Sequence, residues 1–211
     1  FGNQENYAHF HLGKGSKEIQ NRYSDEDYNR FAKNYQLFKN ELFEDKAQQI
    51  TIDLSLEDDL FINGSVRLNL HLKSSTNKGL ISAQLLDYGS TKRLTPIPSP
   101  IEPRAMDNGR YYMLDNLMEL PFADTPHRVI TKGFLNLQNR TDLLTVEEVV
   151  PNQWMELSFE LQPTIYKMAK GAKLRLVLYT TDFEHTVRDK TDYKLIIDLE
   201  KSSLDLPDMV K

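Results

Sequence analysis

The sequence predicts a mainly β protein of the jelly-roll sandwich type, with one helix near its N-terminus. Three observations lead to this fold class: apolar residues recur at every second position in many short segments, turn-forming residues separate these segments, and only one stretch has a helical period. Alternation at every second position indicates a strand, because successive side chains point to opposite faces of a sheet. Roughly eight such segments with turns between them are typical of a β-sandwich. Every connection between them can be antiparallel, so a jelly roll is the most economical arrangement.

The first segment, residues 1–19, is interpreted as a linker because it is polar and contains glycine. His9 and His11 flank Phe10, and a His-x-His pair could place two imidazoles on one metal ion. No third ligand is evident, and structural zinc sites usually have four ligands. The linker is therefore the preferred interpretation, and no metal ligand is predicted.

Residues 24–44 form the predicted helix. Ser24 can cap its first turn, and Asp27 completes a variant of the capping box. An apolar stripe follows at spacings of three and four residues, made of Tyr28, Phe31, Tyr35, Phe38 and Leu42. The preferred interpretation is that this stripe packs on the domain's own sheet, and the alternative is that it docks a neighbouring domain. The predicted division is a linker plus amphipathic helix over residues 1–46 and a jelly-roll β-sandwich over residues 47–211.

The predicted strands cover residues 50–54, 65–73, 80–88, 127–138, 153–162, 174–179 and 193–199, with a further short strand possible at 111–113. His71 falls among the polar residues of its strand and is expected on the solvated face. Residues 89–107 contain four prolines. Because proline removes a backbone donor, a long loop is predicted there rather than a strand. Residues 121–126 are predicted to be irregular as well.

Composition excludes several classes of function. The 211 residues include 26 Lys and Arg against 31 Asp and Glu. No basic cluster is dense enough to predict a phosphate-binding surface, so no nucleic-acid partner is expected. There is no cysteine, which excludes disulfides and fits a reducing compartment. No apolar run approaches the ~20 residues of a membrane span. We therefore expect a cytoplasmic protein without a membrane partner, cut from something longer because it begins with Phe1.

Catalytic motifs are not found in the sequence. The nucleophile elbow Gly-x-Ser-x-Gly, the P-loop, the dinucleotide fingerprint and His-Glu-x-x-His do not occur. A polar loop between the last two predicted strands, Thr180 to Thr191, contains Asp182, Glu184, His185 and Arg188. An aspartate and a histidine this close could form an acid–base pair, but no nucleophile is marked for them to activate. The preferred interpretation is an ordered polar loop, and no catalytic or cofactor-binding residue is predicted.

Trp154 is the only tryptophan. It could form a platform on which a sugar stacks, but a half-buried strand residue is the preferred interpretation. Asn63 and Asn139 begin glycosylation sequons. We interpret both as coincidences of common residues.

Three longer stretches resemble the C-terminal domain of bacterial X-prolyl dipeptidyl aminopeptidases. They are VITKGFLNLQNRTDLLTVEEV (129–149), FELQPTIY (159–166) and KLRLVLYTTDFEHTVRD (173–189). Three earlier stretches, 29–47, 79–89 and 111–121, resemble the same family, so the match runs in order over nearly the whole chain. The resemblance implies a jelly roll related to galactose-binding domains.

The resemblance also implies a parent enzyme. Members of this family are serine peptidases of the α/β-hydrolase class that remove an N-terminal Xaa-Pro dipeptide, and the implied parent is a homodimer. The catalytic serine, aspartate and histidine of the family lie upstream of this domain, so no catalytic residue is carried onto this sequence. The implied partners are the hydrolase domain of the same chain and, through the parent only, a peptide substrate.

Three roles for the domain remain open at this point. As an accessory domain it would pack on the hydrolase domain, with Asp182, Phe183, His185 and Arg188 as the interface candidates, because a polar loop with an aromatic residue suits a contact between domains. As a carbohydrate-binding module it would bind a sugar, by analogy with the galactose-binding domains to which its implied fold is related. As a structural or oligomerisation domain it would use the aromatic stripe of the predicted helix.

Overall fold

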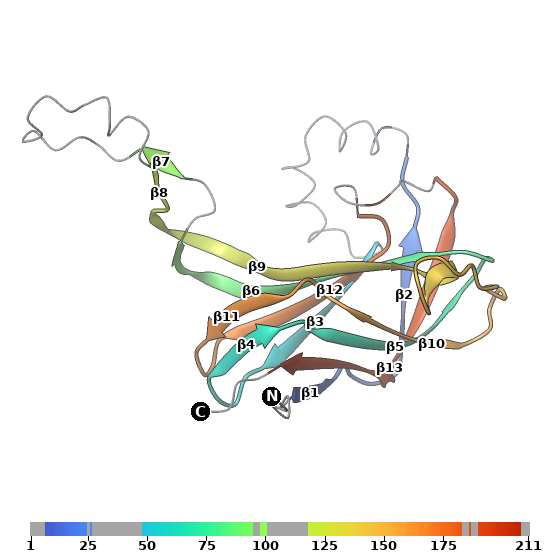
Figure 1. Cartoon of the computed structure of the whole chain (residues 1–211), viewed down its shortest axis with the longest axis horizontal. Helices are drawn as coiled ribbons and strands as arrows, with labels where there is room; N and C mark the ends of the chain where they lie inside the picture. The colour runs from blue at the N-terminus through green and yellow to red at the C-terminus, as the bar shows by residue number, and fades with distance from the viewer. Residues whose placement is uncertain are drawn as a thin grey trace, which may run out of the picture. The chain divides into compact units, whose positions relative to one another are not determined.

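The structure is a computed structural model that describes residues 7–24, 26, 48–94, 98–100, 118–182, 186 and 190–207. These residues contain thirteen strands and one 3₁₀ turn, η1 (Leu137–Asn139) (Figure 1). The predicted helix over residues 24–44 lies outside the described residues except for Ser24 and Glu26, and the possible strand at 111–113 lies wholly outside them. The chain divides into two compact units, residues 1–87 with 129–211 and residues 88–128.

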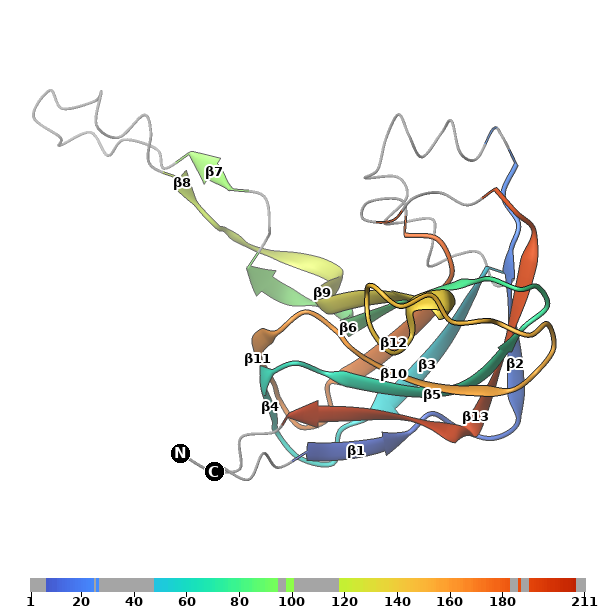
Figure 2. The ribbon, with the colours of Figure 1, turned by 45° about the vertical axis from the view of Figure 1, so that its right-hand side comes forward.

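The first unit is a sandwich of two antiparallel sheets (Figure 2). One sheet contains β1 (Tyr7–His11), β2 (Ser16–Asn21), β13 (Tyr193–Pro207), β5 (Arg67–Ser74) and β10 (Met155–Glu160). The other contains, in order, β3 (Gln49–Ser55), β12 (Lys173–Tyr179), the beginning of β6 (Leu80–Leu94) and the end of β9 (Phe122–Asn136). A short pair, β4 (Leu60–Gly64) and β11 (Thr164–Met168), completes this unit.

Strand pairing shows the jelly-roll winding directly. β2 pairs with β13, β3 with β12, β4 with β11 and β5 with β10, all antiparallel, and β6 adjoins β9. The pairs are nested, so the chain is one long hairpin that is rolled up until its strands form two facing sheets. This topology confirms the predicted fold class.

The core lies between the two sheets and is formed by the alternating apolar residues. Leu68, Leu70 and Leu72 of β5 are almost completely buried. The same is true in β12 and β13 of Leu174, Leu176, Leu178, Leu195, Ile197 and Leu199. Each such side chain contributes about 1.5–3 kcal/mol relative to an exposed one. Local alternation and burial therefore agree in these strands.

The linker prediction for residues 1–19 is wrong where the structure describes them. β2 pairs with the first half of β13 and β1 with its second half, on either side of an irregularity between Asp198 and Ser203. β13 runs on to Pro207, beyond the predicted end near residue 199. Only Ile19 and a few neighbours in these two N-terminal strands reach the core, so the strands have no clear apolar alternation. Their backbone hydrogen bonds to β13 make them strands.

Two loop predictions also fail in part. β6 continues through Gly89 to Leu94, and β9 begins at Phe122 and includes Pro126. β9 is the edge strand of its sheet, and edge strands are among the few places in a sheet where proline is found. β4 and β11 were not predicted, since each is only five residues long and finds its partner about a hundred residues away.

The second unit, residues 88–128, contains the end of β6, the beginning of β9 and the short pair β7 (Ser99–Pro100) and β8 (Met118–Glu119). Arg93 is buried and donates hydrogen bonds from Nη1 to the carbonyl oxygens of Gly89 (2.9 Å) and Thr125 (2.8 Å). Burial, and then the positive charge of Arg93, lower the pKa of His127. Arg93 thus ties the two long strands of this unit together.

Candidate interaction site at the end of β9

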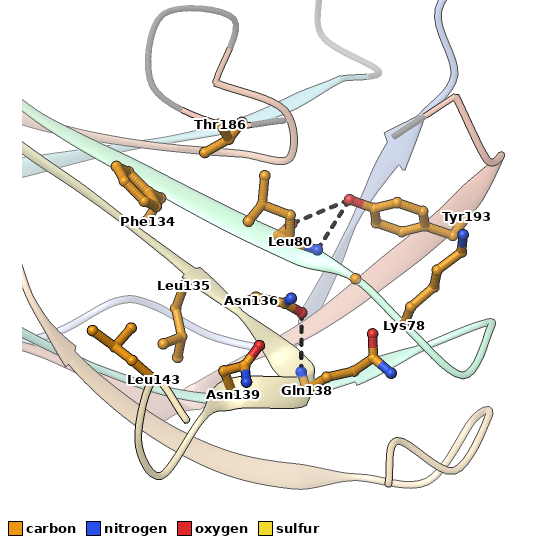
Figure 3. A pocket seen from close by; sticks show the side chains of 11 residues that line it. Lys78, Leu80, Phe134, Leu135, Asn136, Gln138, Asn139, Leu143, Thr186 and Tyr193 are labelled. Carbon is orange, nitrogen blue, oxygen red and sulfur yellow. Dashed lines mark hydrogen bonds between the residues drawn. The ribbon is translucent and has the colours of Figure 1, made fainter. Parts of the chain in front are cut away.

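A cavity of about 370 Å³ lies where β6 begins and β9 ends (Figure 3). Its walls come from Lys78 to Leu80, from the last residues of β9 with η1, and from Leu143, Thr186 and Tyr193. Apolar Phe134, Leu135 and Leu143 and the amide side chains of Asn136, Gln138 and Asn139 share the lining. Thr186 belongs to the polar loop predicted as a domain interface, so the cavity adjoins that loop.

Hydrogen bonds to main-chain amides hold several of the residues around the cavity in place. Tyr193 Oη accepts a hydrogen bond from the Leu80 amide (3.1 Å), and the side chain of Asn136 accepts one from the Gln138 amide (3.1 Å) (Figure 3). Leu137 is fully buried and its amide donates to the carbonyl of Gly79 (2.9 Å). A Cβ at Gly79 would lie only 2.7 Å from Leu137 Cδ1, so a larger residue at this position would force the Leu137 side chain to shift. The cavity is therefore preformed within this unit.

Asp182 is buried at the start of the polar loop rather than presented to solvent. Its side chain is 2 % exposed and accepts a hydrogen bond from Tyr179 Oη (3.2 Å), which in turn accepts one from Gln84 Nε2 (3.0 Å). Burial, and then the charge of Asp182, raise the pKa of Tyr179 well above its ordinary value of 10.0. The Asp182 carbonyl accepts from the amide of Thr186 (3.0 Å) and from its hydroxyl (2.6 Å), which links the start of the polar loop to Thr186 beside the cavity.

Phe183, His185 and Arg188 lie outside the described residues, and the loop's role as an interface stays a prediction. The carboxylate of Asp182 is engaged inside the domain, where it supports the loop.

Asn21 anchors both ends of the polar loop, and sequence reasoning missed it. Its Oδ1 accepts hydrogen bonds from the hydroxyls of Thr180 (2.8 Å) and Thr181 (2.9 Å), and its Nδ2 donates to the carbonyl of Thr191 (2.8 Å). Because Asn21 is itself buried, these bonds satisfy polar groups that would otherwise be isolated from water. The sequence offers little signal for this role, since Asn21 is a single asparagine two residues after the segment interpreted as a linker.

The other notable side chains outside the cavity are aromatic. Trp154 keeps 38 % of its surface exposed, and His71 stacks on it with ring centroids 4.8 Å apart and planes at 9°. Asp198 Oδ2 lies 3.5 Å from His71 Nδ1, and Lys73 Nζ lies 4.8 Å from the centre of the Trp154 ring. His71 is on the outward side of its strand, as expected, but it is largely covered by these neighbours.

His9 and His11 contact each other edge to face, and His9 is hydrogen-bonded to Asp205. In the part of the chain that the structure describes, no three His, Asp or Glu side chains are grouped as metal ligands. Among those same residues, no helix has the length and apolar character needed to cross a membrane.

Solved structures that share this fold include two larger hydrolases. An α-amino acid ester hydrolase matches 92 % of this chain over 33 % of its own, with a TM-score of 0.57 and 14 % identity. A CocE/NonD family hydrolase from Staphylococcus aureus matches 98 % of this chain over 37 % of its own, with a TM-score of 0.57 and 14 % identity. At this identity the likeness concerns the fold alone. The chain has the fold of a β-sandwich domain that makes up about a third of each of these longer chains.

The family is shown by sequence. Residues 3–208 match the family described as X-Pro dipeptidyl-peptidase C-terminal non-catalytic domain, and the chain belongs to it. It is 84 % identical over 207 residues to the Xaa-Pro dipeptidyl-peptidase of Streptococcus gordonii and 75 % identical over 209 residues to that of Streptococcus sanguinis (strain SK36). These matches cover 98 % and 99 % of this chain and 27 % of each relative, so the chain spans about a quarter of the length of the relatives it matches. The resemblance identified from the sequence is confirmed.

Proposed function

We propose that this chain is the C-terminal part of an Xaa-Pro dipeptidyl-peptidase whose hydrolase portion releases N-terminal Xaa-Pro dipeptides by serine-type hydrolysis. The observation that carries the proposal is the 84 % identity to a protein of that name over 98 % of this chain. At this level of identity, substitutions are few enough that the parent's role is expected to be shared. The parent is proposed to be a cytoplasmic homodimer that acts on peptides.

Within that parent the domain is proposed to be an accessory domain that packs on the hydrolase portion. The cavity, the hydrogen bonds between Asp182 and Thr186 and the anchoring of the polar loop by Asn21 support this role, because each orders a surface at the same end of the sandwich. A rigid surface loses little conformational entropy when it docks.

Hydrolysis of Ala-Pro p-nitroanilide tests the proposed activity, with the 211-residue chain and the full-length parent measured side by side. We expect turnover by the parent and none by the chain. Ala-Ala p-nitroanilide is the matched control, and the parent should cleave it far more slowly because proline at the second position is the proposed determinant. Turnover by the 211-residue chain, or a parent that does not release Ala-Pro, contradicts the proposal.

A further inference from the structure

Three aliphatic side chains project into solvent from a single loop, residues 140–148, which we call the Leu144 loop. Leu143, Leu144 and Val146 are 88 %, 94 % and 73 % exposed. Single exposed apolar residues are common, but three within four positions of a polar turn form a cluster that water solvates poorly. Leu143 also lines the cavity, so this apolar cluster is continuous with it.

The loop that carries these side chains is held firmly by its polar residues. Asp142 Oδ1 accepts hydrogen bonds from the amides of Leu144 and Thr145, both at 2.8 Å. Arg140 Nη2 lies 2.6 Å from Glu147 Oε2, and Glu147 Oε1 accepts from the Thr141 amide (3.1 Å).

Both ends of the loop are fixed to the body of the domain. The Glu147 amide donates to the carbonyl of Gln138 (2.7 Å), and Leu137 and Val149, which flank the loop, are buried in the core. The apolar side chains are therefore displayed on an ordered backbone, which is the arrangement that lowers the entropic cost of binding.

The shape of the cluster decides the kind of occupant. A small molecule is bound in a concavity that surrounds it. Leu144 instead projects outward and is bonded to the loop frame only through its backbone. Such a side chain becomes buried when another protein surface supplies a pocket for it. Protein interfaces surround such apolar contacts with a polar rim, and Arg140, Asp142 and Glu147 provide polar groups of this kind next to Leu144. The three acidic residues of the loop, Asp142, Glu147 and Glu148, also disfavour an anionic lipid surface.

We propose that the Leu144 loop, together with the adjoining cavity, is the surface on which the hydrolase portion of the same parent chain docks. This inference rests on the proposed function and adds to it the surface that makes the contact. The relatives contain about three quarters of their length outside the region matched here, since the chain covers 27 % of each. The rest of the parent is thus a tethered partner at high effective concentration, which favours it over free proteins.

Thiol labelling of the full-length parent tests the proposal. The 211 residues contain no cysteine, so Leu144→Cys places a single reporter in this domain, and peptide mapping separates it from any cysteine elsewhere in the parent. Ile165→Cys is the matched control, because Ile165 is an aliphatic residue that is 72 % exposed on β11. In the native parent we expect position 144 to be alkylated about tenfold more slowly than position 165, since a docked side chain is reached only through local opening. Both positions should react equally fast in urea.

Each other outcome overturns the proposal in a recognisable way. Equal labelling rates in the native parent, with Ala-Pro release intact, show that the Leu144 loop is free while the proposed function stands. Protection that fades when the parent is diluted assigns the surface to a second copy. Protection that requires a peptide substrate assigns it to substrate binding. A wild-type parent that does not release Ala-Pro refutes the proposed function. The ratio of labelling rates at positions 144 and 165 then still decides whether the Leu144 loop is covered in the parent.

Discussion

Two loops at the same end of the sandwich use their side chains in opposite ways. The polar loop from Thr180 to Thr191 directs Thr180, Thr181 and Asp182 inward, where Asn21 and Tyr179 bind them. In the Leu144 loop the polar side chains form hydrogen bonds within the loop itself, and Leu143, Leu144 and Val146 point outward. The comparison shows that buried polar groups maintain the domain, whereas exposed apolar groups are available for contact with something else.

Removal of the Asn21 side chain is expected to have the largest effect on the stability of the domain. Asn21→Ala leaves two threonine hydroxyls and a carbonyl without their buried partner, so we expect a loss of about 3 kcal/mol in the free energy of unfolding. Urea denaturation of the 211-residue chain measures it. Gln20→Ala is the control, because the side chain of Gln20 donates its hydrogen bond to Glu18 on the exposed face, and it should change stability by less than about 0.5 kcal/mol. Equal losses in the two variants would show that Asn21 does not anchor the loop.

Tyr179→Phe is expected to have an intermediate effect that depends on pH. The variant removes the hydroxyl between Gln84 and Asp182, so we expect a loss of about 1–2 kcal/mol near neutral pH.

The sign of the pH dependence follows from the direction of the pKa shift. The pKa of Tyr179 is raised in the folded state, so the protonated form is favoured on folding, and this stability is fully present below the ordinary value of 10.0 and is lost as pH rises toward the folded pKa. Wild-type stability should therefore fall more steeply above pH 10 than that of the variant. Parallel curves of unfolding free energy against pH would contradict the burial of this hydroxyl.

Replacement of the outward-facing leucines is expected to have the smallest effect on stability, in contrast to the loss of the buried polar groups. Leu143→Ser with Leu144→Ser should change the stability of the 211-residue chain by no more than about 0.5 kcal/mol, because both side chains are already in water. Urea denaturation beside the Asn21→Ala chain gives the comparison on one scale. A loss above about 1 kcal/mol would mean that these leucines pack within their own domain.

Sequence patterns located the strands whose signal is local, and they found the candidate site only in part. The alternation of Leu68, Leu70 and Leu72 marks a strand wherever the chain carries it, because the period of two depends on neighbouring residues alone. The Asp-Leu-Leu run at 142–144 could have been noticed as apolar residues in a turn, but a pattern does not say whether such residues are buried or exposed. Thr180 to Thr191 was identified as a polar loop, while the inward direction of Asp182 was not.

By itself, the sequence determined the mainly β class, the jelly-roll expectation and the family, since alternation and long runs of matching residues are properties of the chain read in order. The tertiary structure alone decided that β1 and β2 join β13, that β4 meets β11, that Asn21 binds Thr180 and that Leu144 is left in water. The physical reason is that these features depend on pairs of residues many positions apart. Hydrogen bonding and exposure at each of them are settled only when the rolled hairpin brings the distant segments together.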